Sequence, residues 1–189
     1  MPELRDLPLF RWGAELRRAR AARRRRNVRL ACGLAGLTLL TATAVVPPAP
    51  LLVWNVSASA PRGLYAVRTH ARLARGDMVV AWTPREVRTL AAQRRYLPAN
   101  VPLVKRVAAA PGDSVCATDA RMLVRGVSVA LRLRHDTAGR SLPWWVGCRR
   151  LGPDEFLLLM PAAHSFDGRY FGPVCGHAIV GKAVPLWVR

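Results

Sequence analysis

Residues 103–117 read LVKRVAAAPGDSVCA, two short runs of apolar and small residues on either side of a Pro-Gly-Asp turn. Short runs of this kind, bounded by Gly and Pro, are typical of β-strands. Similar runs recur through the second part of the chain and predict a mostly β domain. The expected strands are Leu64–Arg68, Asp77–Trp82, Leu103–Ala108, Ser114–Ala117, Met122–Arg125, Glu155–Met160 and Ala178–Val184.

One segment of this domain has the pattern of a helix. Thr83 offers a capping hydroxyl, Pro84 suits the first helical position, and Glu86 stands three residues after the threonine. These residues together form a capping-box pattern. The segment predicts one inserted helix that runs to about Arg95 and ends before Pro98.

The composition excludes several classes of protein. The chain has 189 residues, of which 51% are hydrophobic, so it is too apolar for a disordered chain. No repeat of fixed period is visible, so a solenoid is not expected. Lys and Arg together number 30 against 11 Asp and Glu, a net charge of +19, and the only two lysines are Lys105 and Lys182.

The N-terminal region combines a basic stretch with an uncharged apolar one. Residues 1–29 are rich in arginine, and residues 30–46 read LACGLAGLTLLTATAVV without a charge. An apolar segment of this length, ended by Pro47 and Pro48, predicts a transmembrane helix over 30–47. A basic stretch next to a single membrane segment stays on the cytoplasmic side of the membrane. Residues 1–29 are therefore predicted to be a cytoplasmic tail, and residues 48–189 an exported domain.

Other interpretations of the basic and apolar stretches remain open. The arginine run could bind nucleic acid, and Ala42-Thr43-Ala44 fits the cleavage site of a signal peptide. We favour an uncleaved anchor that contacts membrane lipids, and we expect no nucleic-acid partner. The arginines of the exported part are either a solvated surface or a site for anionic lipid or an acidic partner. Leu51–Trp54 is an apolar, aromatic stretch suited to a membrane interface.

Three of the four cysteines lie in the predicted exported part, where disulfides are allowed. Cys32 falls within the apolar segment and is expected to be a small filler residue. The spacing of the cysteines matches no zinc-binding pattern, and no metal is expected. The preferred disulfide is Cys116–Cys148, which leaves Cys175 unpaired.

Two segments contain residues that could carry chemistry. Ser57 and Ser59 lie among small residues before Pro61 and Gly63, an arrangement that exposes hydroxyls and backbone N–H groups. Lys105 stands in an apolar strand of a chain that otherwise uses arginine. Burial can lower the pKa of a lysine from about 10.4 toward the range of about 7–8 that a general base needs, whereas arginine stays protonated.

A third segment is structural in character. In residues 164–173, HSFDGRYFGP, Asp167 and Arg169 predict a loop held by an ion pair. The four histidines stand in no recognisable catalytic triad, and the chain has no Gly-rich phosphate-binding loop. No cofactor is expected.

These three segments, in this order, resemble the signal peptidase family of Ser/Lys proteases. The resemblance rests on KRV-x₃-PGD (105–113) and SFDGRYFGP (165–173), and it covers about residues 50–189. The form S-x-P-x-G-L-Y over 59–65 resembles the TraF-type conjugal-transfer branch. The usual Ser-Met-x-Pro is here Ser59-Ala60-Pro61, and the usual Asp-Ser-Arg is Asp167-Gly168-Arg169.

The resemblance implies a signal-peptidase-like (LexA-like) β fold and specific roles. Ser59 resembles the nucleophile and Lys105 the general base, while Ser57 stands where some members supply an oxyanion-hole hydroxyl. Ser165 resembles the serine that orients the lysine. Asp167 and Arg169 resemble the pair that braces the active-site loop.

The resemblance also implies a function, a partner and a location. The chain would be a membrane-anchored serine endopeptidase that cleaves, or cyclises, an exported pilin-like precursor for conjugative transfer. Its catalytic domain would be periplasmic and its single anchor would lie in the inner membrane. Two alternatives stay open: a general signal peptidase, and a non-enzymatic, membrane-anchored component of a secretion or conjugation apparatus.

Overall fold

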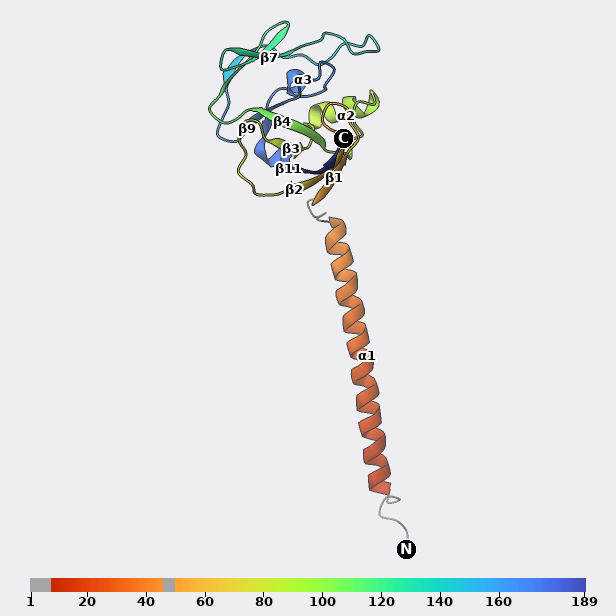
Figure 1. Ribbon diagram of the computed structural model, residues 1–189. Helices are drawn as coiled ribbons and strands as arrows, with labels where there is room; N and C mark the ends of the chain where they lie inside the picture. The colour runs from red at the N-terminus through yellow and green to blue at the C-terminus, as the bar shows by residue number, and fades with distance from the viewer. Residues whose placement is uncertain (1–7, 46–49) are drawn as a thin grey trace. The chain divides into compact units, whose positions relative to one another are not determined.

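The computed structural model describes residues 8–45 and 50–189. The chain divides into two compact units, Met1–Pro48 and Ala49–Arg189, and each is described by itself. The described part of the first unit is one continuous helix of 38 residues, α1 (Pro8–Val45), rich in the helix-favouring residues Ala, Leu and Arg (Figure 1).

Helix α1 contains most of the predicted tail and anchor. Residues 30–45 of the predicted anchor lie in α1, and residues 46–47 lie outside the described residues, as do residues 1–7 of the predicted tail and residues 48–49 of the predicted exported domain. Within residues 8–45 and 50–189, no helix is long and apolar enough to cross a membrane. The transmembrane anchor therefore stays a prediction.

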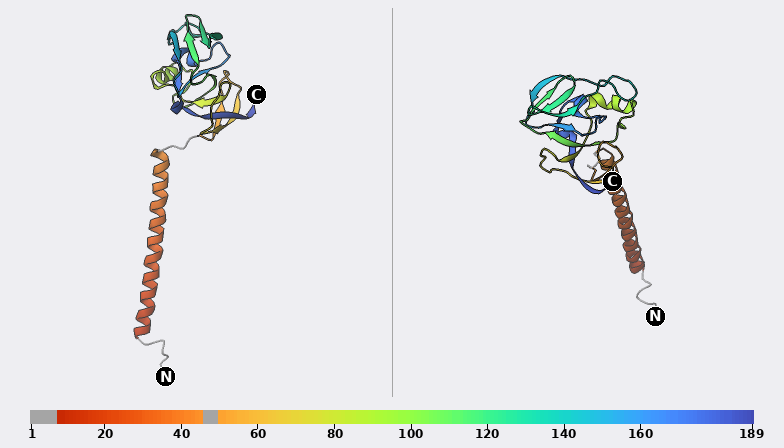
Figure 2. Two further views of the ribbon diagram at one scale, coloured as in Figure 1. Left: turned by 90° about the vertical axis from the view of Figure 1, so that its left-hand side faces the viewer. Right: turned by 45° about the horizontal axis from the view of Figure 1, so that its top comes forward.

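The second unit is mostly β, as the sequence predicts, and its strands curve around the interior (Figure 2). Every named strand pair within it is antiparallel. A seven-stranded sheet has the order β1-β2-β11-β3-β4-β9-β10, and a four-stranded sheet has the order β7-β6-β5-β8. The strands are β1 (Leu52–Asn55), β2 (Gly63–Arg68), β3 (Met78–Ala81), β4 (Leu103–Ala109), β5 (Ser114–Ala117), β6 (Arg121–Val124), β7 (Val127–Leu131), β8 (Gly147–Arg150), β9 (Glu155–Leu159), β10 (Val174–Cys175) and β11 (Ile179–Val188). The remaining elements are α2 (Arg85–Gln93), α3 (Gly168–Phe171) and the 3₁₀ turn η2 (Gly176–Ala178).

Strand β4 leads from the seven-stranded sheet into the four-stranded one. It pairs with β3 on one side and β9 on the other, and the Pro-Gly-Asp turn leads from it directly into β5 of the second sheet. Ala109 at the end of β4 and Val115 in β5 are completely buried in one core cluster. Asp113 fixes the turn, because its carboxylate accepts hydrogen bonds from the backbone N–H of Ala110 and from Arg125.

The second sheet carries the preferred disulfide. Cys116 of β5 and Cys148 of β8 are register partners on adjacent strands, and their sulfur atoms are bonded. Cys32 and Cys175 are free and exposed.

The inserted helix is present, but its predicted cap is wrong. Helix α2 begins at Arg85, with Pro84 at the cap position and no capping side-chain hydrogen bond. The Thr83 hydroxyl is buried without a hydrogen-bond partner in the described structure, and the Thr83 carbonyl instead accepts two bonds from the Arg88 guanidinium. Because Pro84 occupies the cap itself, Thr83 lies one residue too early to reach the free N–H groups of the first turn.

In one segment the structure adds a strand, and in another it changes a local expectation. Leu52–Asn55, which none of the expected strands covers, is a strand paired with β2, and Leu52 and Trp54 keep exposed side chains. The segment around Asp167, predicted as a loop, contains the short helix α3, and Asp167 caps it by accepting a hydrogen bond from the Arg169 N–H.

Candidate active site

The first candidate segment forms a tight turn after β1, and Asn55 holds it in shape. The Asn55 side-chain amide donates to the carbonyls of Ser57, Ala60 and Pro61, at 3.0–3.1 Å, and its oxygen accepts from the Ser57 N–H at 3.1 Å. Asn55 is only 6% exposed, so these bonds are shielded from water. The buried Asn55 side chain therefore binds the carbonyls of the turn that carries Ser59.

Ser57 and Ser59 contact each other on this turn. Their Oγ atoms lie 2.9 Å apart, and the Ser59 N–H donates to Ser57 Oγ at 3.3 Å. The Ser57 hydroxyl, to which the resemblance gives an oxyanion-hole role, and the Ser59 N–H are thus neighbours. In this structure they bond to one another, so a substrate oxygen would have to take the place of that bond.

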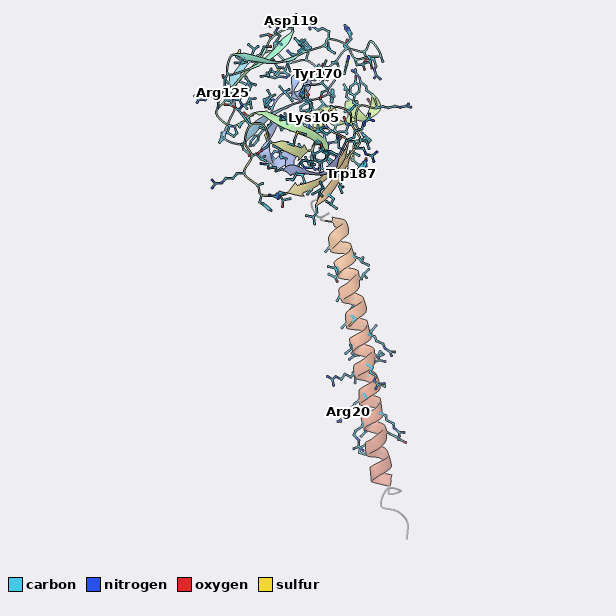
Figure 3. The ribbon with its side chains drawn as sticks, in the orientation of Figure 1. Arg20, Lys105, Asp119, Arg125, Tyr170 and Trp187 are labelled. Carbon is cyan, nitrogen blue, oxygen red and sulfur yellow. A yellow bond between two sulfur atoms is a disulfide. The ribbon has the colours of Figure 1, made fainter. Side chains whose placement is uncertain are left out.

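Lys105 lies in the interior of the second unit and reaches this turn from β4 (Figure 3). Its Nζ donates to Ser59 Oγ at 2.8 Å and to Ser165 Oγ at 2.8 Å. The lysine is 5% exposed and Ser165 is 2% exposed. One amine is therefore held between two hydroxyls that come from segments 46 and 60 residues away in the sequence.

The surroundings of this amine disfavour its charge. Burial lowers the pKa of Lys105 from 10.5 to about 8; the Asp167 carboxylate acts against this shift, and the Arg169 guanidinium adds to it. A pKa of about 8 leaves a useful fraction of neutral amine near neutral pH. In that form the lysine can accept a proton from Ser59.

Asp167 and Arg169 form a buried ion pair behind Ser165. Arg169 Nε lies 2.8 Å from Asp167 Oδ1, and both side chains are almost completely buried. The Arg169 guanidinium also donates to the carbonyls of Leu131, Met160 and Ala163, at 2.5–3.2 Å. This pair therefore ties the segment that carries Ser165 to Met160, directly after β9, and to the end of β7.

A cavity of about 470 Å³ opens beside Ser59 and Lys105. Four parts of the chain line it: residues 53–59, 96–105, 133–142 and 162–170. Most of the lining is apolar, which suits the extended side chains of a peptide better than a charged ligand. Among the described residues, no group of three or more His, Cys, Asp or Glu side chains converges to hold a metal ion.

One wall of the cavity comes from a segment that the sequence patterns do not single out. Asp136 accepts hydrogen bonds from Tyr96, which follows α2, and from Arg140. The Tyr96 hydroxyl lowers the pKa of Asp136 most, and bonds from Arg140 and Ala138 add to this effect. The Arg94 side chain also donates to the Ser141 carbonyl at 2.6 Å. These bonds hold residues 133–142 against the segment after the inserted helix.

Arg132 and Asn55 are two further residues whose importance the sequence does not reveal. Arg132 is 5% exposed, donates to the carbonyls of Thr118, Trp145 and Arg169, and lies 3.6 Å from the ring centre of Trp144. Arg132 binds backbone carbonyls 13 to 37 residues away, whereas Asn55 binds carbonyls of its own turn, two to six residues ahead. A buried polar side chain bonded to carbonyls has no sequence pattern of its own.

The comparisons with known proteins agree on one family. The family model for signal peptidase, peptidase S26, matches residues 24–188. A conjugal transfer protein TraF from Agrobacterium fabrum is 34% identical over 166 residues, covering 82% of this chain and 92% of the relative. A plasmid transfer protein TraF from Escherichia coli is 34% identical over 143 residues, covering 70% of this chain and 80% of the relative.

A signal peptidase I structure from Enterococcus faecalis V583 also aligns, at 20% identity with a TM-score of 0.36, over 59% of this chain and 97% of that chain. The family assignment rests on the family model and the two relatives.

Proposed function

Because this chain belongs to the signal peptidase family, peptidase S26, we propose that it is a membrane-anchored serine endopeptidase with a Ser59–Lys105 dyad. The observation that carries the proposal is the 2.8 Å distance from the Lys105 amine to the Ser59 hydroxyl, combined with the burial that lowers the pKa of that amine to about 8. A neutral amine in contact with a serine hydroxyl is the arrangement that a Ser/Lys hydrolase requires.

The proposed reaction begins with proton transfer. Neutral Lys105 takes the proton of Ser59, and Ser59 Oγ attacks the carbonyl carbon of the scissile peptide bond. The Ser59 N–H and the Ser57 hydroxyl turn from each other to the carbonyl oxygen, on which negative charge develops. Removing one such donor in other hydrolases costs about 3–4 kcal/mol of transition-state stabilisation.

The second half of the reaction releases the products. The protonated Lys105 gives its proton to the leaving amine, and an ester between Ser59 and the precursor remains. Lys105 then takes a proton from water or from an incoming amine, which attacks the ester, and passes this proton to the Ser59 oxygen as the ester bond breaks. Water yields a cleaved precursor, whereas an amine of the same precursor yields a cyclic one. Ser165, bonded to the Lys105 amine at 2.8 Å, keeps that amine pointed at Ser59 through these transfers.

The names of the relatives support a role in conjugation. One relative is named a conjugal transfer protein and the other a plasmid transfer protein, and the substrate proposed for this chain is an exported, pilin-like precursor of a conjugative apparatus. Residues 30–47 would anchor the chain in the inner membrane, with the peptidase domain in the periplasm. The anchor brings the site to membrane lipids, where the apolar segment of an exported precursor emerges.

The test is co-expression of the full chain with candidate precursors, followed by mass measurement of the products. We expect Ser59→Ala and Lys105→Ala each to reduce processing by about a thousandfold or more, because each removes one half of the dyad. The other lysine gives a matched control: Lys182→Ala removes only a surface ion pair with Asp77 and should process normally. Ser128→Ala, at an exposed serine of β7, is the control for Ser59.

The results also separate the alternatives. Normal processing by Lys105→Ala would overturn the proposed mechanism. Processing of many unrelated precursors, with rescue of a strain depleted of its own signal peptidase, would instead indicate a general signal peptidase.

A further inference from the structure

A second hollow adjoins Ser59. Its volume is about 450 Å³, and it shares Ala58, Ser59 and Ala162 with the cavity described above. The rest of its lining differs, because it includes three arginines. We call this hollow the arginine groove and define it by Arg62, Arg106 and Arg189.

The three arginines come from different elements but converge near the dyad. Arg106 follows Lys105 directly in β4, and Arg62 lies three residues after Ser59. The Arg189 N–H donates to the Arg62 carbonyl at 2.9 Å, which ties the segment after β11 to the turn that carries Ser59. The cluster is therefore produced by the fold and not by a run of basic residues.

These arginines have no carboxylate partner within residues 8–45 and 50–189. All three are exposed, and in the described part of the chain none of them forms an ion pair with a carboxylate. Six other arginines do so; they are Arg75, Arg125, Arg134, Arg140, Arg149 and Arg169. The Arg189 guanidinium lies 4.7 Å from the ring centre of Trp187, a contact that leaves its charge in place. Because arginine cannot lose its proton at accessible pH, three guanidinium groups without a carboxylate partner around one hollow attract an anion.

We infer that the arginine groove binds a carboxylate of the precursor that lies within a few residues of the scissile bond. This inference rests on the proposed function. A peptide bond placed over Ser59 has chain on both sides, and the two hollows that meet at Ser59 are apolar and basic respectively. One side of the bond fills the apolar cavity, and the other carries a carboxylate into the groove, where guanidinium groups match the geometry of its two oxygens.

The test measures a ratio on precursors that the wild-type chain processes in neutral detergent. Glu or Gln is placed at successive positions on either side of the scissile bond, and kcat/KM for the Glu form is divided by that for the Gln form. At the position that faces the groove, we expect a ratio of about ten in the wild type, falling to about one in the triple variant R62Q/R106Q/R189Q. Both precursors are cleaved by the same enzyme. Any change that replacing Arg106, the neighbour of Lys105, makes to the protonation of Lys105 therefore cancels in the ratio.

Two further variants sharpen this test. Arg121→Gln, at an exposed arginine of β6 outside the groove, should keep the wild-type ratio. R106E should favour a precursor with Lys at that position over one with Glu.

Two further measurements identify the source of the carboxylate. If it is the chain-terminal carboxylate of the precursor, adding residues at that terminus should lower kcat/KM in the wild type and not in the triple variant. A Glu/Gln ratio of one at every position, together with no effect of the added residues, would overturn the inference. A triple variant that loses binding to phosphatidylglycerol vesicles but keeps the wild-type ratio would assign the arginines to lipid and overturn it as well. Failure of the wild type to process any precursor would instead count against the proposed function.

Discussion

At the scale of single residues, Lys105 gives the site its chemistry, because a buried amine can be neutral and a buried guanidinium cannot. Its pKa of about 8 comes mainly from burial. Two hydroxyls accept its hydrogen bonds, so the amine stays oriented although it lies away from water.

The protonation of Lys105 predicts a pH profile. The base is active only when neutral, so kcat/KM should rise about tenfold per pH unit up to about pH 8 and then level off. The measurement is the rate of precursor cleavage between pH 6 and about 10. A rate that falls with pH across this range would contradict Lys105 as the base.

Stability provides an independent control for the same pKa. The pKa is about 8 in the folded chain and 10.5 as the ordinary value, so between these values the unfolded chain binds more protons. The free energy of unfolding should therefore rise with pH over that range, by about 3 kcal/mol in total. Lys105→Met removes the titrating group, and urea unfolding of that variant should lack this rise.

Asn55 is predicted to position Ser59 without touching the reacting atoms. Asn55→Ala removes four hydrogen bonds from the turn and should lower the free energy of unfolding by about 2–4 kcal/mol. It should also lower kcat by about tenfold, with the apparent pKa still near 8, because the amine keeps its burial. Asn100→Ala, at an exposed asparagine, is the control. A variant that loses stability but keeps kcat would limit Asn55 to a structural role.

At the scale of elements, the packing of α3 against β9 explains a departure from the family pattern. Gly168 begins α3 where the family usually has serine. A Cβ at this position would lie 2.8 Å from Leu157 Cδ1 and 2.9 Å from the Leu158 carbonyl oxygen. The leucine side chain can shift, but the carbonyl belongs to a paired strand, so the close approach of the two backbones requires glycine.

This contact predicts that Gly168→Ala and Gly168→Ser both destabilise the chain, by about 1–3 kcal/mol. Urea unfolding measures the loss. Gly152→Ala is the control, since its Cβ would approach only the side chain of Glu155 and should cost much less. Equal stability of the Gly168 and Gly152 variants would show that α3 and β9 can move apart.

The elements also show how far sequence reasoning reaches. The strands around Lys105 and the inserted helix were predictable because their signals are local: apolar runs, turns and a proline at a helix start. Strands β1, β7 and β8 carry exposed side chains, and their pairing with neighbours defines them. Thr83 matched a local capping pattern, but the backbone placed Pro84 at the cap.

The candidate site likewise has residues with a local sequence signal and residues without one. Ser59, Lys105 and Ser165 belong to motifs, and the structure brings their side chains together. The cavity wall depends on Tyr96 and Asp136, which are 40 residues apart. No local pattern links such residues, so their contact emerges only from the fold.

At the scale of the whole molecule, the chain joins a basic and apolar N-terminal unit to a β unit with its own core. The predicted anchor over 30–47 remains to be tested. We expect the full chain to stay with membranes during alkaline carbonate extraction, and Leu39→Arg, which places a charge near the middle of the segment, to weaken that retention. Complete release of the unaltered chain would contradict an anchor, and a mature N-terminus just after Ala44 would indicate a cleaved signal peptide.

The Cys116–Cys148 cross-link ties an edge strand of the small sheet to its neighbour, so the stability of the domain depends on the redox state of its compartment. Cytoplasmic thiols are kept reduced, so a copy there would have β8 attached by backbone pairing and packing alone. Oxidation after the proposed export would close a loop of 32 residues and add about 3–4 kcal/mol of stability. A copy retained among reduced thiols would therefore remain the looser, more easily degraded form.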